Sequence, residues 1–423
     1  MLKGKELSIH IARLMTDIDE LGQIGINALG GLDRTTFTQS ELAARNWLKD
    51  QLHQVNLIVK TDQAANIWGK RTGQEKLPSI VFGSHLDTVP NGGKYDGALG
   101  VLIALEIMRV FEENEIMTRH PLQLVSFSAE EPNPFGLSTF GSRAVTGKLT
   151  TEEILIVADP AGTLLTDALQ AAGGDLDTFE NCVLQPEELS AYLEVHIEQG
   201  KRLLNRSVPI GIVTAITGIY RESITVIGEA NHAGTTIMED RKDALTAASE
   251  LILSLERACL NHPSNEVVGT IGRMNILPNA PNIIPHKVCM TLEIRGKSSV
   301  EIQDILAAFT TECLRVTEKR FVHIDRKVLL NQSPASMDSF IIDTMKEIVS
   351  NWEYPYYLLG SMAGHDAAHM ANITKSGMLF VPSLGGKSHC PDEESRLEDI
   401  EKAANTLLHT ILMLDQKLDT QRG

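Results

Sequence analysis

Residues 81–100, VFGSHLDTVPNGGKYDGALG, pass from an apolar strand through a glycine-rich loop into a helix. The apolar run LPSIVFGSHLDTV (77–89) predicts a buried strand, and GVLIALEIMRVFEEN (100–114) predicts a buried helix. A second buried strand follows in HPLQLVSFSAEEPNPFG (120–136), where polar residues and prolines end it. This repetition of strand, loop and helix predicts an α/β fold with a mostly parallel sheet that helices cover on both faces.

Polar side chains follow these strands where each strand ends. His85 and Asp87 come after the first strand, and Glu130 and Glu131 come after the second. In open parallel sheets, ligands bind at the carboxyl ends of the strands. The sequence therefore predicts a functional site at this edge of the sheet.

The pattern changes at about residue 213. Residues 213–329 alternate apolar and polar positions with period two, and two long helices, 241–260 and 299–321, interrupt them. This pattern predicts a smaller two-layer α+β domain. It is inserted into a larger domain formed by residues 1–212 and 330–423.

Composition limits the classes of function. A net charge of −17 over 423 residues, without a basic run, argues against binding to nucleic acid and favours a small-molecule substrate. No stretch has the eighteen or so apolar residues that a membrane span needs. Residues 1–25 are typical of an amphipathic helix rather than a secretion signal. Because the five cysteines form no CxxC pair, we expect neither a zinc knuckle nor disulfides, and we expect a cytoplasmic protein.

Imidazole and carboxylate side chains occur together at five separate strand or loop ends. Such groups are ligands for Zn²⁺ or Mn²⁺, and also for Co²⁺ or Ni²⁺. Two ions a few ångströms apart need about five or six ligands, one of them a bridging carboxylate. The count predicts a centre with two divalent metals, built from His85, Asp96, the pair Glu130–Glu131, His196 and His389.

Plainer explanations exist for each of these residues. Asp87 could cap a turn, Asp96 is a common Asp-Gly turn residue, and a single histidine at a strand end is usually just hydrogen-bonded. The glutamate pair is different, because it leaves a buried strand where unpaired charge is costly. His365 and His369 in GHDAAH have the spacing of a helical metal pair but lack the glutamate of HExxH. We interpret His365 and the adjacent Asp366 as substrate-side or hinge residues and His369 as structural.

Five motifs carry a family resemblance: GSHLDTV, YDGALG, FSAEEPNPFG, LEVHIEQG and SHCPDE. In this order they resemble the M20 metallopeptidase family, and within it the amidase branch of N-carbamoyl-L-amino acid hydrolases, allantoate and ureidoglycolate amidohydrolases and β-ureidopropionases. The resemblance covers nearly the whole chain, with residues 213–329 as the lid domain. It implies that His85 and His389 bind different metals, that Asp96 bridges them, and that Glu131 and His196 complete the ligand set.

The resemblance also implies roles around the metals. Asp87 orients His85, Glu130 is the general base, and His232 in EANHAGTT donates to the oxyanion from the lid. Arg295 in TLEIRG and Asn282 in PNAPNIIP hold the substrate carboxylate, with Gln199 as a weaker candidate. Arg295 could instead be a surface arginine at a strand end, and Asn282 a turn residue. The branch implies a homodimer formed through the lid.

His196 stands where peptidase members of the family have a carboxylate, which favours ureido or amide substrates. We expect metal-dependent hydrolysis of the C–N amide bond of an N-carbamoyl group on a small carboxylate, foremost an N-carbamoyl-L-amino acid, giving the amino acid, CO₂ and ammonia. The alternatives are an allantoate or ureidoglycolate amidohydrolase and an M20-type dipeptidase or aminoacylase. A binding protein without activity would be expected to have lost Glu130 or a metal ligand, and a serine hydrolase would need the G-x-S-x-G motif.

Two departures from the family pattern bear on detail. The lid motif has Ile237 where relatives usually have proline, which predicts a less rigid loop after His232. EEPNPFG (130–136) resembles the ureidoglycolate-type members, whereas FGSRAVTG (140–147) resembles the carbamoyl-amino-acid hydrolases. The motifs therefore leave the choice among ureido substrates open.

Overall fold

The computed structural model describes residues 7–264 and 266–418, and the chain divides into two compact units. The first unit contains residues 1–214, 337–359 and 365–423, and the second contains 215–336 and 360–364. The sequence placed the insertion at 213–329, without the short segment 360–364. Of the amphipathic helix expected over residues 1–25, helix α1 covers Ile11–Leu21, and residues 1–6 lie outside the described part.

The middle of the central sheet is parallel, and its outer strands are antiparallel. Its strand order is β1-β2-β4-β3-β5-β13-β6-β11, and β12 also pairs with β6. β3 runs parallel to both β4 and β5, and β5 runs parallel to β13, whereas the outer pairs are antiparallel. The strands are β1 (Ile58–Thr61), β2 (Ile67–Arg71), β3 (Ser79–His85), β4 (Leu122–Phe127), β5 (Leu189–Ile197), β6 (Ile210–Ile216), β11 (Ala335–Ser336), β12 (Tyr356–Ser361) and β13 (Ser376–Val381).

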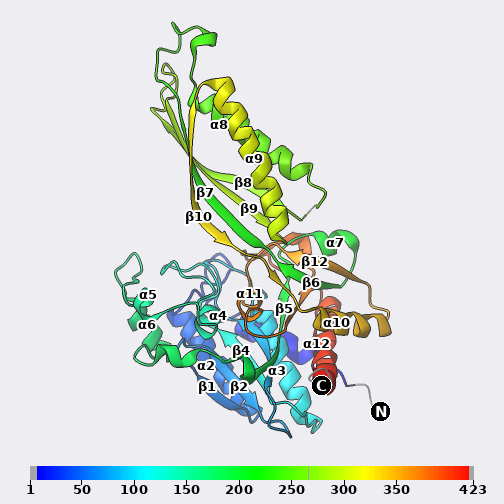
Figure 1. The fold of residues 1–423 in the computed structure, drawn as a ribbon. Helices are drawn as coiled ribbons and strands as arrows, with labels where there is room; N and C mark the ends of the chain where they lie inside the picture. Colours follow the sequence, from blue (N-terminus) through cyan, green and yellow to red (C-terminus); the bar gives the residue numbers. More distant parts are fainter. Residues whose placement is uncertain (1–6, 265, 419–423) are drawn as a thin grey trace. The chain divides into compact units, whose positions relative to one another are not determined.

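Helices cover both faces of this sheet, which confirms the predicted fold class (Figure 1). All seven residues of β3 are buried, as a strand covered on both faces requires. On one face, Ile80 and Phe82 pack in a core with α3 and α12. The helices of the first unit are α1, α2 (Gln39–Gln54), α3 (Ala98–Glu113), α4 (Phe140–Val145), α5 (Thr151–Leu155), α6 (Leu165–Ala171), α7 (Arg202–Arg206), α10 (Ser339–Asn351), α11 (Ala367–Met370) and α12 (Leu397–Lys417).

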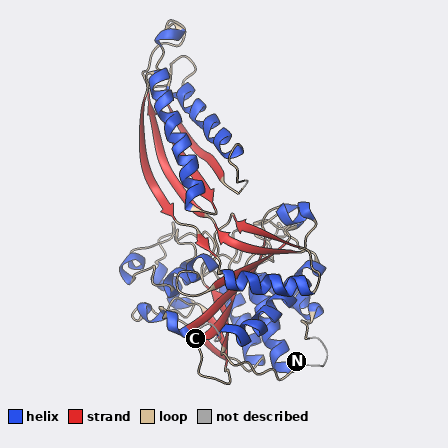
Figure 2. Ribbon diagram, turned by 45° about the vertical axis from the view of Figure 1, so that its right-hand side comes forward, coloured by secondary structure: helices blue, strands red, loops and turns tan. Residues whose placement is uncertain are grey.

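The second unit is a two-layer α+β structure, as predicted. Its antiparallel sheet has the order β10-β7-β9-β8, and two long helices, α8 and α9, pack on one face (Figure 2). Residues of β7 and β9 alternate between buried and half-buried, because every second side chain faces the helices. The elements are β7 (Gly218–Ile227), α8 (Ala244–Leu260), β8 (Val268–Leu277), β9 (Lys287–Gly296), α9 (Ser299–Arg320) and β10 (His323–Gln332).

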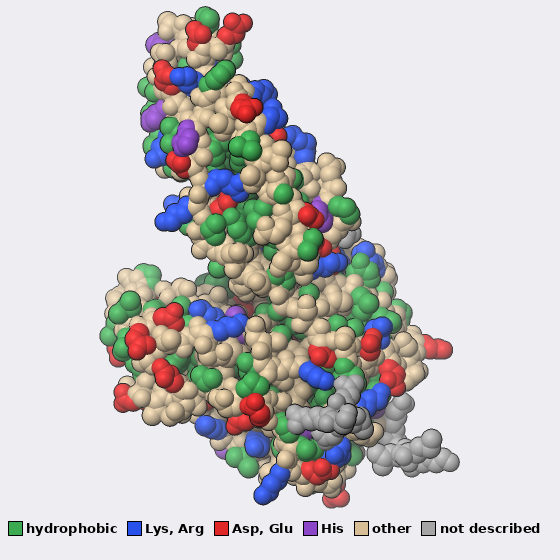
Figure 3. Space-filling view, viewed as in Figure 1, with side chains coloured by type: hydrophobic (Ala, Val, Ile, Leu, Met, Phe, Trp, Pro, Cys, Tyr) green, Lys and Arg blue, Asp and Glu red, His purple; other side chains and the backbone are tan. Residues whose placement is uncertain are grey.

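Charged side chains of both signs lie on the visible face of the molecule (Figure 3). Lys and Arg are interspersed with Asp and Glu over the face shown in Figure 3, in keeping with the net charge of −17. Among the described residues, no helix is both long and apolar enough to cross a membrane.

Candidate active site and metal centre

The predicted metal ligands lie at one edge of the central sheet. His85 is the last residue of β3, His196 is next to last in β5, and the pair Glu130–Glu131 follows β4 by three residues. His389 follows β13 in a loop. Since β3, β4, β5 and β13 are parallel, their carboxyl ends meet here.

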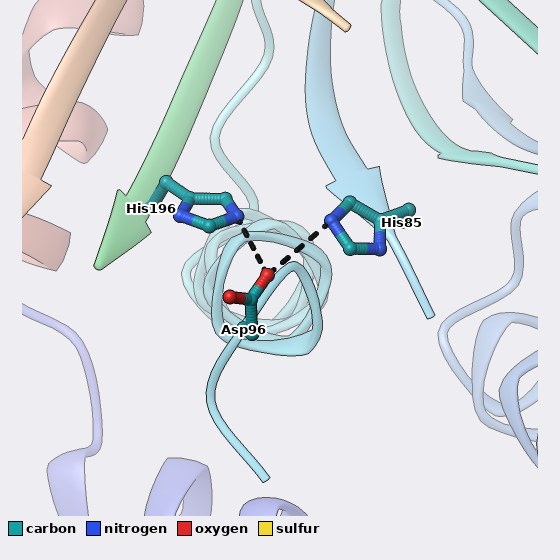
Figure 4. Close-up of side chains that lie close together, drawn as sticks. All are labelled: His85, Asp96 and His196. Carbon is teal, nitrogen blue, oxygen red and sulfur yellow. Dashed lines mark ion pairs between the residues drawn. The ribbon is translucent and has the colours of Figure 1, made fainter. Parts of the chain in front are cut away.

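One group of candidate ligands consists of His85, Asp96 and His196, all buried. The Nε2 atoms of both rings point at one oxygen of Asp96 (Figure 4). The distance to Asp96 Oδ1 is 3.7 Å from His85 Nε2 and 3.2 Å from His196 Nε2. Asp96 reaches this position from the loop that leads into α3.

The Nδ1 atoms of the two rings are hydrogen-bonded to the backbone, and their Nε2 atoms face Asp96, where His196 Nε2 also accepts from the Gly97 amide at 3.1 Å. His85 Nδ1 lies 3.0 Å from the carbonyl oxygen of Asp87, and His196 Nδ1 lies 2.9 Å from that of Ile197. Because a carbonyl oxygen only accepts, each Nδ1 carries the proton. The Nε2 lone pairs therefore face a carboxylate, an arrangement that a cation between them stabilises.

The second group of candidate ligands is Asp96, Glu131 and His389. His389 Nε2 lies 3.4 Å from Asp96 Oδ2 and 3.2 Å from Glu131 Oε1. Asp96 thus offers one oxygen to each group, which is how a carboxylate bridges two cations. The imidazole and carboxylate donors fit two divalent metal ions.

The electrostatics of the centre agree with this fit. Hydrogen bonds to Asp96 and Glu131 raise the pKa of His389 to about 10. Burial lowers the pKa of His85, but the adjacent carboxylates, Glu130 foremost, outweigh burial and raise it well above its usual value. The same negative field that raises these pKa values attracts a divalent cation.

Glu130 belongs to neither ligand group. Its side chain is buried, and Oε2 lies 3.7 Å from His85 Nε2. Burial raises the pKa of this carboxyl well above its usual value, and the nearby His85 opposes the rise. A carboxyl group beside the metal ligands, with an affinity for protons, is suited to the task of a general base.

Asp87 connects His85 to the glutamate pair. Its Oδ1 accepts a hydrogen bond from the Glu130 amide at 3.2 Å, and its Oδ2 accepts one from the Glu131 amide at 3.1 Å. The carboxylate lies 3.5 Å from His85 Nδ1, which is farther than the Asp87 carbonyl oxygen. The carboxylate that was expected to orient His85 therefore also fixes the backbone of Glu130 and Glu131.

Sequence reasoning missed two residues that hold Asp96. Glu393 is buried and accepts hydrogen bonds from the amides of Tyr95 and Asp96 at 2.8 and 2.9 Å. Ser388 donates to Asp96 Oδ2 at 2.6 Å. Both lie in KSHCPDEES, where nothing distinguishes Glu393 from its neighbours Asp392 and Glu394 except burial, which only the fold reveals.

Gln199 and His365 also lie at this centre. Gln199 Nε2 donates to Asp96 Oδ2 at 2.7 Å, and Gln199 Oε1 is buried without a hydrogen-bond partner among the described residues. The His365 ring packs against His196 with 4.6 Å between centroids, and burial lowers the pKa of His365 well below its usual value. His369 lies apart from the ligands, with Nε2 2.9 Å from Thr139 Oγ1 and Nδ1 3.1 Å from Lys148 Nζ.

The backbone is strained around the centre. Ala129, Gln199 and His389 all have left-handed φ values, 54°, 60° and 58°. Such conformations cost free energy in residues other than glycine and cluster at functional sites. Here Ala129 directly precedes Glu130, and the side chains of Gln199 and His389 reach Asp96.

His232 lies on a loop of the second unit with its ring in a defined state. Nδ1 accepts hydrogen bonds from the amides of Gly234 and Thr235 at 3.0 and 3.2 Å, so Nε2 carries the proton of the neutral ring and can donate. Arg241 Nη2 donates to the carbonyl oxygens of Ala233 and Thr236 at 2.6 and 3.0 Å. These bonds brace the loop in which Ile237 replaces proline.

Arg295 lies near the end of β9 and is held by two acceptors. Its Nε donates to Glu293 Oε1 at 2.8 Å, and its Nη1 donates to the Met362 carbonyl oxygen at 2.9 Å. Asn282 is instead beside His232, because its carbonyl oxygen accepts from the Ala233 amide at 3.0 Å and Ile283 forms a bridge with His232. Arg295 and Asn282 are therefore at opposite ends of the same strand.

The distance between these ends limits how Arg295 and Asn282 could act on one substrate. Eight residue steps separate Lys287, the first residue of β9, from Arg295, and at ~3.3 Å per residue they span ~26 Å. Asn282 precedes Lys287, in a loop that continues beyond the strand. In an N-carbamoyl-amino acid the ureido carbon is three bonds from the carboxylate carbon, so the two lie at most about 3.8 Å apart. One chain cannot hold a single small carboxylate with both Arg295 and Asn282.

Comparison with known proteins places these features in context. The model of peptidase family M20/M25/M40 matches residues 81–413. An N-carbamoyl-L-amino acid amidohydrolase of Geobacillus stearothermophilus is 34% identical over 405 residues, covering 96% of this chain and 98% of the relative. A ureidoglycolate hydrolase of Arabidopsis thaliana is 32% identical over 418 residues, covering 97% of this chain and 88% of the relative.

A solved structure shares the fold over nearly its full length. The crystal structure of an amidase of the hydantoinase/carbamoylase family from Burkholderia multivorans superimposes with a TM-score of 0.89 at 30% identity. The match covers 96% of this chain and 98% of that protein.

Proposed function

This chain belongs to peptidase family M20/M25/M40, in its amidase/carbamoylase branch, and we propose that it is a metal-dependent amidohydrolase of ureido acids. The bond cleaved is the C–N amide bond of an N-carbamoyl group on a small carboxylate. The foremost substrate is an N-carbamoyl-L-amino acid, which gives the amino acid, CO₂ and ammonia. The observation that carries the proposal is Asp96 shared between two groups of metal ligands, with Glu130 buried beside them.

The residues of the first unit divide the chemistry among them. His85, Asp96, His196, Glu131 and His389 hold two divalent cations, Zn²⁺ or Mn²⁺ foremost. When bound, the cations supply Lewis acidity to the scissile carbonyl and to the attacking water. A Glu130 carboxylate oxygen takes the proton of that water and delivers it to the leaving nitrogen.

Residues of the second unit serve the substrate. Arg295 presents a planar guanidinium that pairs with the substrate carboxylate through two parallel hydrogen bonds. His232 donates its Nε2 proton to the oxyanion that forms at the attacked carbon. From the first unit, Gln199, whose Oε1 has no hydrogen-bond partner among the described residues, accepts from the ureido N–H groups.

The separation of Arg295 from His232 supports a dimeric site. A carboxylate held by Arg295 and an oxyanion held by His232 of the same chain would lie far more than a substrate length apart, since about 26 Å of β9 intervenes. We infer that each centre uses Arg295 of its own chain, with His232 and Asn282 contributed by the partner subunit. The chain enters and leaves the second unit at the end that carries Arg295, since Gly218 pairs with Gly296.

A substrate panel tests the proposed activity. Ammonia release is measured with N-carbamoyl-L-amino acids, allantoate, ureidoglycolate and dipeptides, in the presence of Mn²⁺ or Zn²⁺ and after chelation. We expect the highest kcat/KM on an N-carbamoyl-L-amino acid and loss of activity on chelation. Cleavage of dipeptides without ammonia release from any ureido acid would contradict the proposal and favour the dipeptidase alternative.

A mixing experiment tests the shared site. His232→Ala should lower kcat about a hundredfold with metal content intact, and Glu130→Gln should be inactive. If His232 acts in the partner, mixed dimers regain one complete site of two, and an equimolar mixture recovers about a quarter of wild-type activity. Dimers that exchange subunits and never complement, or a fully active monomer, would refute the shared site.

Ureidoglycolate or allantoate is the second candidate substrate. The glutamate motif EEPNPFG and the similarity to the Arabidopsis thaliana ureidoglycolate hydrolase favour it. The same substrate panel decides between this candidate and an N-carbamoyl-L-amino acid. A kcat/KM at least tenfold higher on ureidoglycolate or allantoate than on every N-carbamoyl-L-amino acid would replace the first candidate.

A further inference from the structure

Three charged side chains form a row on the face of the second unit's sheet that the helices leave open. Glu293 lies between two arginines, Arg295 two residues along β9 and Arg221 directly across on β7. Glu293 Oε1 accepts from Arg295 Nε at 2.8 Å, and Oε2 accepts from Arg221 Nε at 2.9 Å and from Arg221 Nη2. Each oxygen of one carboxylate thus serves a different guanidinium.

The contacts of Arg295 determine which of its donors are available. A guanidinium has five N–H groups, of which Nε–H binds Glu293 and one Nη1–H binds the Met362 carbonyl oxygen. Two contacts on different nitrogens fix the plane of the group. Three donors on Nη1 and Nη2 are left for a ligand, and these two nitrogens form the edge that matches a carboxylate.

The charges of the row sum to one positive charge. Hydrogen bonds from Arg221 and Arg295 outweigh the effect of burial and lower the pKa of Glu293, so the carboxylate is ionised. Glu293 alone would neutralise Arg295, and Arg221 restores the net positive charge. The half-buried side chains, 30% exposed for Arg295 and 26% for Glu293, allow this charge to act on a ligand.

We propose that Glu293 is a positioning residue that aims Arg295 at the substrate carboxylate, and that Arg221 compensates the charge of Glu293. The inference rests on the proposed function of Arg295. It implies that this row selects substrates with a carboxylate at the position that Arg295 reaches, without Glu293 or Arg221 touching the substrate.

A positioning role and an effect of charge alone predict opposite changes in carboxylate affinity when Glu293 is replaced. Removing a negative charge beside Arg295 raises the local positive potential and should tighten the binding of a carboxylate if charge alone matters. Removing the acceptor also frees the guanidinium to rotate, which weakens a bidentate contact. If Glu293 positions Arg295, the second effect dominates.

The test compares Glu293→Ala, Glu293→Gln and Arg221→Gln, with kcat and KM measured on an N-carbamoyl-L-amino acid and on its uncharged carboxamide. Glu293→Ala should lower kcat/KM on the acid about tenfold to thirtyfold, mainly by raising KM. It should change kcat/KM on the amide less than about twofold. Glu293→Gln, which keeps an acceptor, should retain more activity than Glu293→Ala. Arg221→Gln should lower kcat/KM on the acid about two- to fivefold, because a positive charge is lost.

Inhibition by the product amino acid gives a second readout, because its Ki should rise in parallel with KM. Glu250→Gln is the matched control: Glu250 binds Arg315, Lys319 and Arg320 between α8 and α9, away from the row. This control should reduce the stability of the second unit without changing the acid-to-amide ratio. A lower KM or Ki in Glu293→Ala, or equal losses of kcat/KM on acid and amide, would overturn the proposal. If Glu293→Ala does not fold, the same comparison is made with Glu293→Gln.

Failure of the inference is distinguishable from failure of the proposed function. A wild-type enzyme that hydrolyses no N-carbamoyl acid contradicts the function. If Arg295→Ala keeps the preference for the acid over the amide, the role of Arg295 is wrong, and Glu293 and Arg221 lose their proposed roles with it. If Arg295→Ala loses that preference and Glu293→Ala keeps it, only the positioning role fails.

Discussion

Glu130 and Glu131 are adjacent residues with different surroundings. Glu131 lies 3.2 Å from His389 and belongs to a ligand group, whereas Glu130 lies outside both groups. Asp87 holds the amides of both residues, which fixes where each side chain begins. We therefore propose proton transfer for Glu130 and metal binding for Glu131.

Substitution of each glutamate by glutamine should separate these roles. Glu130→Gln should lower kcat by at least about a thousandfold with metal content near that of the wild type, because a carboxamide cannot take the proton. Glu131→Gln should weaken metal binding, measured by competition with a chromophoric chelator. Retention of more than a few per cent of kcat in Glu130→Gln would require another base.

At this scale the sequence indicates the candidate ligands more readily than the residues that hold Asp96 in place. His85 and His196 could be predicted because each ends an apolar strand, and the order of motifs relates them to Asp96 and His389. Glu393 and Ser388 could not, since an acidic residue after a Pro-Asp turn is normally solvated. Only the loop packing brings Glu393 to the amides of Tyr95 and Asp96.

His369 provides a test of electrostatics outside the metal centre. Burial, with the charges of Lys148 and Arg143, lowers the pKa of His369 from 6.5 to about 3. As pH falls below 6.5 the unfolded chain binds a proton that the folded chain excludes, so His369 costs stability at low pH. The cost grows by at most about 1.4 kcal/mol per pH unit.

The variant His369→Asn should remove this pH dependence. Urea denaturation between pH 7 and pH 4.5 should show the wild type losing stability relative to the variant as pH falls, with the slope given above. His53→Asn, at an exposed position of α2, controls for the loss of an imidazole. A difference between wild type and His369→Asn that does not change with pH would contradict the account.

The start of α3 shows how one element positions a metal ligand. Gly97 has a φ of 63°, and a Cβ atom there would lie 2.3 Å from the His85 ring. The turn delivers Asp96 to His85 and His196 and then begins the helix at Ala98. Glycine is required by both the backbone conformation and the space.

Gly97→Ala should therefore displace His85 and weaken the metal centre. We expect the affinity for metal to fall about tenfold or more, since groups that orient a ligand typically contribute that much. Isothermal titration of the metal-free protein with Zn²⁺ measures the effect. The control is Gly136→Ala, at a glycine whose Cβ would have open space and whose φ of 71° imposes similar backbone strain. Equal metal affinities for the two variants would contradict this role.

Strand pairing carries information that the alternating pattern does not. The sequence predicts strands in TLEIRG and RESITVIGEANHAG, but the pattern of one strand does not specify its partner or its register. The observed pairing of Arg295 with Ile219 and of Lys287 with Ile227 places Arg295 and the His232 loop at opposite ends of the sheet. That separation, rather than any single residue, is the basis of the proposed site that a partner subunit completes.

At the scale of the whole molecule, the sequence predicts the two-layer insertion but not all of its members. Residues 360–364 join the second unit although they follow its main segment by more than twenty positions. They are held there by the bond from Arg295 to Met362 and by the bond of the Gly360 amide to Glu266 Oε1 at 2.9 Å. A segment this short has no periodicity from which its place could be predicted.

The central claim is that two divalent cations at the shared Asp96 support hydrolysis of a ureido acid. The most direct measurement titrates metal-free protein with Mn²⁺ or Zn²⁺ and records ammonia release from an N-carbamoyl-L-amino acid. The account predicts no activity without metal and a plateau at two equivalents per chain, with Asp96→Asn inactive throughout. Full activity without metal, or no ammonia release from any ureido acid with two equivalents bound, would contradict it.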